Sequence, residues 1–125
     1  MKSDDEITAI IIGCALKVHT ALGPGLLESA YQQCLYHELL KSGLRVEKQV
    51  TLPLIFDGVK LECGYRMDLL VEGRIVIEIK SIDAFDRIHF AQLLTYLKLS
   101  DNRIGLLFNF NVVRLKEGIK RVVNG

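Results

Sequence analysis

Hydrophobic positions recur along this chain at two different spacings, and the spacing separates predicted helices from predicted strands. Near the N-terminus, apolar residues return every three or four positions over residues 4–22, which predicts a helix that Gly23-Pro24-Gly25 ends. The same spacing predicts two more helices, over residues 26–41 and 86–99. These three segments make up the predicted helical part of the chain.

The middle of the chain is rich in Val, Ile and Leu that alternate with polar residues, which is typical of strands. Residues 45–55 are expected to be extended, and Asp57-Gly58 predicts a tight turn into a second strand that starts at residue 59. Residues 65–81 predict a β-hairpin, and residues 103–110 predict a buried strand.

The predicted order is helix, helix, three or four antiparallel strands, helix and strand, with a short extended or turned tail over residues 112–123. This order predicts an α/β fold of the α+β kind, in which helices flank a central, mostly antiparallel mixed sheet. The chain has 125 residues, half of them apolar, and no repeat or linker. We therefore expect a single domain over residues 1–125.

The register of the hairpin decides where its charged residues point. A two-residue turn would pair Asp68 with Ile77 and place the acid on the apolar face, whereas a three-residue loop over residues 72–74 pairs Asp68 with Glu78. The second register separates apolar from charged groups, and a one-residue slip is costly when a face is buried. We therefore predict the three-residue loop, with Asp68, Glu78 and Lys80 together at one end of the hairpin.

Composition excludes several classes of protein. The net charge of +1 leaves no broad cationic surface, and no apolar run reaches the roughly 20 residues of a membrane span. The acidic N-terminus is unlike a signal peptide, so we expect a cytoplasmic protein with no membrane partner. Cys14, Cys34 and Cys63 are isolated in sequence, and we expect buried small apolar residues rather than a disulfide frame or a zinc site.

Three charged groups on one core hairpin are unfavourable unless they pair with each other or bind an ion. Asp68, Glu78 and the backbone carbonyl of Ile79 are oxygen ligands of the kind that Mg²⁺ or Mn²⁺ prefers. Lys80 beside them can orient or deprotonate a water, or neutralise charge on a phosphate. By pattern alone, a structural ion-pair cluster explains the same residues equally well.

Two predicted helices add further candidates. Glu28 follows Gly25 and precedes Tyr31 at three-residue steps, so the three are expected to share one helix face. Glu28 is then either a further metal ligand or an acid that favours the helix N-terminus. Gln92 and Tyr96 lie one turn apart, where they can hold an attacking water or a phosphate. Together these groups suit in-line hydrolysis of a phosphodiester.

Asp68 followed by Glu78-Ile79-Lys80 resembles the PD-(D/E)XK nuclease superfamily, although Met67 stands where the superfamily name has Pro. The signature Gly25-Leu-Leu-Glu28-Ser-Ala-Tyr31 and the segment around Gln92 and Tyr96 resemble the GxxExxY protein family, over about residues 7–124. The resemblance implies a restriction-endonuclease-like core of a helix, three antiparallel strands, a helix and a further strand. It also implies the following roles: metal-binding acids at Asp68 and Glu78, the catalytic lysine at Lys80, the helix acid at Glu28, and the Gln-xxx-Tyr motif at Gln92 and Tyr96.

Two function classes follow. The first is a magnesium- or manganese-dependent nuclease that acts on DNA or RNA, and the intact Glu78-x-Lys80 pair favours it. The second is a catalytically silent module of the same fold that binds nucleic acid or a protein partner. The small size and near-neutral charge favour the second class, or an enzyme that acts as a homodimer or with a partner. A third possible function, hydrolysis of a small-molecule phosphodiester, is supported by no feature of the sequence.

Overall fold

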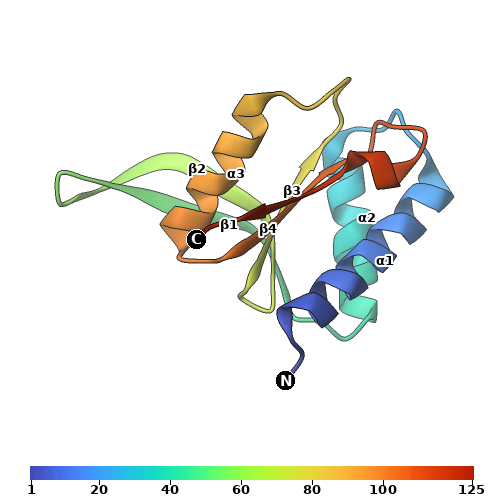
Figure 1. The fold of residues 1–125 in the computed structure, drawn as a ribbon, viewed down its shortest axis with the longest axis horizontal. Coiled ribbons are helices and arrows are strands. Elements are labelled where there is room, and N and C mark those ends of the chain that lie inside the picture. The colour runs from blue at the N-terminus through green and yellow to red at the C-terminus, as the bar shows by residue number, and fades with distance from the viewer.

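The chain begins with two helices that pack on one face of the sheet (Figure 1). In the computed structural model, which describes residues 1–125, α1 spans Asp4–Leu22 and α2 spans Glu28–Lys41. The Ser3 hydroxyl accepts the Glu6 N–H, and the Glu6 carboxylate accepts the Ser3 N–H, so a capping box fixes the start of α1. The predicted bounds of α1 are confirmed, and α2 begins two residues later than expected.

Five strands form one sheet in the order β1-β2-β3-β4-β5. The remaining elements are β1 Val46–Phe56, β2 Val59–Val71, β3 Ile75–Lys80, α3 Arg87–Ser100, β4 Ile104–Asn109, a short 3₁₀ helix η1 Leu115–Gly118, and β5 Ile119–Val123. Neighbouring strands are antiparallel except β3 and β4, which run parallel because α3 crosses over between them. The predicted α+β class with a mixed, restriction-endonuclease-like sheet is confirmed, and the tail supplies a fifth strand.

The central strands β3 and β4 are buried on both faces, and this explains why β3 is apolar almost throughout. A large apolar cluster lies between the sheet and α1 and α2, and it includes Ile75, Ile77 and Ile79 of β3. A smaller cluster lies on the other side against α3, and it includes Val76 of β3 and Leu93 of α3. Alternate residues of β3 therefore enter different cores. Figure 1 shows α3 on the face opposite α1 and α2.

The hairpin between β2 and β3 has the predicted register. Leu69 pairs with Ile77 and Leu70 with Val76, which leaves residues 72–74 as the three-residue loop. Glu72 and Gly73 both have positive φ in that loop, a conformation that Gly73 adopts without the steric cost that a side chain brings. The register directs Glu78 away from the core beneath α1 and α2.

The β1–β2 hairpin extends well beyond the body of the molecule (Figure 1). The Asp57-Gly58 turn joins its strands, as predicted, and Pro53 lies on the edge strand β1 next to a shift in pairing. The side chains of residues 59–66 are all exposed. Cys63 lies in this hairpin and is exposed, so the expectation that all three cysteines are buried was wrong. None of the helices combines the length and hydropathy that a membrane span requires.

Candidate active site

Two carboxylates join β2 and β3 at the point where the ladder between them ends. The last backbone pair is Leu69 with Ile77, and the next residues along are Asp68 and Glu78. Glu78 Oε2 accepts the backbone N–H of Asp68 at 2.8 Å, and Asp68 Oδ2 accepts the backbone N–H of Ile79 at 2.8 Å. Each side chain therefore replaces a strand-to-strand bond across the gap, and the two acids converge on one spot.

Burial makes this pair of acids unfavourable in its fully ionised form. Glu78 is only 4% exposed, and burial, followed by the charge of Asp68, raises the pKa of Glu78 to about 8. Burial also raises the pKa of Asp68, although the hydrogen bond from Ile79 and the charge of Lys80 oppose that shift. At neutral pH the metal-free site therefore retains a proton, because two negative charges in this position lack a sufficient positive counterpart.

The same chemistry fits a divalent cation. Such an ion prefers carboxylate and carbonyl oxygens, and it would supply the positive charge that two converging acids lack. In an extended strand the N–H and C=O of one residue point to the same side, so the carbonyl of Ile79 shares the side on which its N–H meets Asp68. No three acidic, histidine or cysteine side chains lie close enough together to hold an ion. The donor set is thus two carboxylates and one carbonyl.

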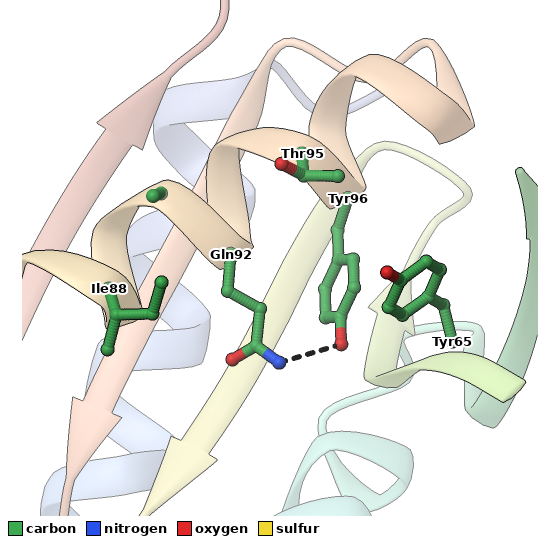
Figure 2. Close-up of a pocket in the computed structure, with 6 residues that line it drawn as sticks. Tyr65, Ile88, Gln92, Thr95 and Tyr96 are labelled. Carbon is green, nitrogen blue, oxygen red and sulfur yellow. Dashed lines mark hydrogen bonds between the residues drawn. The ribbon is translucent and has the colours of Figure 1, made fainter. Parts of the chain in front are cut away.

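Lys80 links these acids to α3. Its ammonium donates to Gln92 Oε1 at 3.4 Å, and the Gln92 amide donates to the Tyr96 hydroxyl at 3.0 Å, as Figure 2 shows for the second bond. The positive charge of Lys80 partly opposes the rise in the pKa of both Asp68 and Glu78, which indicates that its ammonium lies close to the two carboxylates. Burial and the charge of Glu78 raise the pKa of Tyr96. The structure therefore brings Gln92 and Tyr96 to the same site as the hairpin residues.

Glu28 lies at the rim of this site rather than inside it. It is the first residue of α2, its side chain is exposed, and its Oε2 accepts the N–H of Ser81 at 3.2 Å. Its charge raises the pKa of Asp68 and of Glu78, but it does not join them in a three-acid cluster. Glu28 as a third ligand, one of the two roles expected from the sequence, stays a prediction, because in this geometry its carboxylate accepts the Ser81 N–H just after β3.

Gly25 and Tyr31 hold the entry to α2. Gly25 lies before the helix with φ +97°, so the expectation that it shares a helix face with Glu28 was wrong. Tyr31 is fully buried and stacks on Phe110 with ring centroids 4.6 Å apart. Its hydroxyl donates to the Gly23 carbonyl at 2.6 Å and accepts the Leu26 N–H at 3.1 Å. Tyr31 thus fixes the loop that presents Glu28 to Ser81.

Asn109 supports the site, and its position in an apolar strand predicted no role for it. It is 2% exposed at the end of β4, beside Lys80. Its amide donates to the Ile82 carbonyl at 2.9 Å, and its Oδ1 accepts the N–H groups of Ile82 and Asn111 at 3.1 Å each. The segment that follows Lys80 is therefore clamped. A lone buried amide at the end of an apolar strand was the signal available in the sequence.

Gln49 is a second such residue. It lies in β1 between residues that pair with Leu69 and Met67, which places it opposite Asp68. Its φ of +52° is uncommon for a residue with a side chain. Its amide donates to Gln32 of α2 at 2.8 Å, and a hydrogen bond from its side chain lowers the pKa of Asp68. Nothing in the strand pattern indicated that β1 would twist in this way.

Comparison with known proteins gives a family and a fold. The sequence pattern of the PD-(D/E)XK nuclease superfamily matches residues 5–122. The crystal structure of SSO0001 is similar over 94% of this chain, with a TM-score of 0.52 and 21% sequence identity. The chain spans 66% of the length of that protein, and at this identity the likeness shows the fold alone. No curated protein has a matching sequence.

Proposed function

Because the chain belongs to the PD-(D/E)XK nuclease superfamily, we propose that it hydrolyses phosphodiester bonds of DNA or RNA with the help of a divalent cation. Nucleases of this superfamily generally use divalent metals. We further propose that the ion is Mg²⁺ or Mn²⁺, and that the chain is a member of the GxxExxY branch. The motif residues of that branch, Gly25, Glu28 and Tyr31, build the entry to α2 at the rim of the site.

The observation that carries this proposal is the reciprocal bonding of a buried acid, Glu78, and a half-buried acid, Asp68, beside a lysine. A structural ion-pair cluster would pair each acid with a cation. Asp68 and Glu78 instead bond to each other's strands, and neither makes a salt bridge. Burial raises the pKa of both acids, so their fully ionised form is unfavourable for stability, and a bound cation would relieve that cost.

In the proposed reaction the site residues have separate roles. Asp68, Glu78 and the carbonyl of Ile79 hold the ion, which when bound supplies a Lewis acid for the phosphate and lowers the pKa of a water. Lys80 orients the attacking water and offsets the charge that develops on the phosphate. Gln92 positions the Lys80 ammonium through its Oε1. Tyr96 holds the Gln92 amide in the orientation that allows this contact.

Glu28 acts from the rim in this proposal. Its charge makes the potential at Asp68 and Glu78 more negative, so it increases the attraction for a cation without a direct bond in the present geometry. Its bond to Ser81 also ties α2 to the segment that follows Lys80. In this proposal Glu28 is therefore not a metal ligand; it contributes negative charge and holds α2 next to the end of β3.

We expect cleavage that depends strictly on a divalent cation. Labelled single-stranded and duplex DNA and RNA are incubated with the purified chain in Mg²⁺, in Mn²⁺, and in chelator. Products should form with either ion and disappear with chelator, because without the ion the site lacks the positive charge that would stabilise the phosphate and activate a water. A chain that cuts no substrate with any ion, alone or as whatever oligomer it forms, would leave the catalytically silent module as the better description.

A further inference from the structure

A pocket of about 300 Å³ opens beside the candidate active site, on the outer side of α3. It is lined by Tyr65, Ile88, Ala91, Gln92, Thr95 and Tyr96. Figure 2 shows Tyr65 reaching from β2 to stand next to Tyr96, while the other lining residues come from α3. Two elements therefore form one hollow, and the proposed reaction uses only the Gln92 and Tyr96 side chains of its wall.

The walls of this pocket are aromatic and apolar, with a few uncharged polar groups. The Tyr65 and Tyr96 rings lie 6.2 Å apart between centroids, and Tyr65 remains 38% exposed. Ile88 is 66% exposed, which is a large apolar surface to leave in water beside a polar site. The Gln92 amide and the Thr95 hydroxyl add groups able to form hydrogen bonds. Such walls suit a flat, uncharged ring with polar edges.

No charged side chain lines the pocket, so it is not suited to a phosphate. Lys80 places a positive charge next to the pocket, since its ammonium contacts Gln92 at 3.4 Å. Gln92 thus belongs both to the pocket and to the site where the phosphate is expected. A strand whose phosphate lies at Lys80 would carry a base next to this hollow, since a phosphate and the adjoining base are linked through a single sugar.

We propose that this pocket holds one unpaired nucleobase of the strand that is cut, stacked on the exposed ring of Tyr65. The inference rests on the proposed nuclease function and narrows its substrate to single strands or unpaired segments. A base inside a duplex is covered on both faces by its neighbours and engaged on its edge, so it reaches a side pocket only after leaving the stack. Stacking on an aromatic side chain does not depend on which base is present.

The test compares Tyr65→Leu, which removes the ring, with Tyr65→Phe, which keeps it. The probe is a single-stranded oligonucleotide that carries 2-aminopurine, whose fluorescence reports stacking and requires no turnover. We expect the wild-type chain and Tyr65→Phe to change this fluorescence on binding, and Tyr65→Leu to bind about tenfold more weakly with little change. In cleavage assays the Leu variant should lose activity mainly through a higher KM, and single strands should be cut faster than duplex.

Equal binding, fluorescence and KM for the Leu variant and the wild type would overturn the pocket assignment, as would duplex cleavage as fast as that of single strands. Those results would leave the nuclease proposal in place, because it rests on cleavage with a cation. Absence of cleavage with an intact fluorescence difference between Tyr65→Leu and Tyr65→Phe would have the opposite meaning, and would support a base-binding pocket on a catalytically silent module. Melting curves of both variants check that Tyr65 is not needed for folding.

Discussion

Replacing Lys80 by alanine is expected to slow cleavage by about 10²- to 10⁴-fold while the chain stays folded, because one positioned charge or proton-transfer group contributes that much. Lys80 is half-buried at the end of β3 and makes no salt bridge, so its loss should leave the chain folded, with a modest loss of stability because its charge offsets those of Asp68 and Glu78. The measurement is single-turnover cleavage of a labelled strand in Mg²⁺, together with the melting temperature.

Lys98→Ala is the matched control for this variant. Lys98 is an exposed lysine near the end of α3 and contacts none of the site residues by hydrogen bond or ion pair. The Lys98→Ala variant also loses one positive charge, in this case from α3. Its cleavage rate should stay within a few-fold of the wild-type rate. Comparable losses in both variants would mean that Lys80 acts only through the general charge of the surface.

Glu78→Gln is expected to abolish cleavage and at the same time to stabilise the metal-free chain at alkaline pH. The pKa of Glu78 rises from an ordinary 4.5 to about 8 in the fold, chiefly through burial. The folded state therefore holds a proton that the unfolded state releases, and stability falls as pH rises from about 4.5 through about 8. Glutamine mimics the protonated acid and removes that loss, which is on the order of a few kcal/mol.

Urea unfolding in chelator, at a series of pH values from acidic to alkaline, measures this difference. The two chains should be alike near pH 4.5, and the Gln variant should be clearly more stable above pH 8. Glu62→Gln on the exposed β1–β2 hairpin is the control, and as a surface change it should stay within about 0.5 kcal/mol of wild type. A Gln variant that is less stable at every pH would indicate that Glu78 is a structural acid.

The hairpin register was predictable because strand residues alternate in direction and a buried face tolerates no slip. That rule alone selected the three-residue loop over residues 72–74 and the pairing of Leu69 with Ile77. Helix spacing located α1 and α3 to within a residue or two, and the i, i+4 spacing of Gln92 and Tyr96 placed both on one side of α3.

Other parts of the site depend on loops and on contacts distant in sequence, which local spacing does not reveal. The start of α2 at Glu28 excludes Gly25 from the helix, and the bond to Ser81, 53 residues away, decides where Glu28 points. Asn109 acts on Ile82 across 27 residues. Gln49 lies opposite Asp68 through pairing between β1 and β2, and its left-handed backbone inside β1 is not predicted by local spacing. Each of these contacts forms only when the sheet is packed, so it cannot be predicted from local sequence spacing.

The most direct test of the account is a calorimetric titration of Mn²⁺ into the wild-type chain and into Asp68→Asn at about pH 7. We predict that each wild-type chain binds one ion. Binding should release a proton, because the ion displaces the proton that Asp68 and Glu78 share at this pH. The variant should take up no ion at the same concentrations. Absence of uptake by the wild-type chain, or equal uptake by both, would contradict the proposal that Asp68 and Glu78 converge to hold a cation.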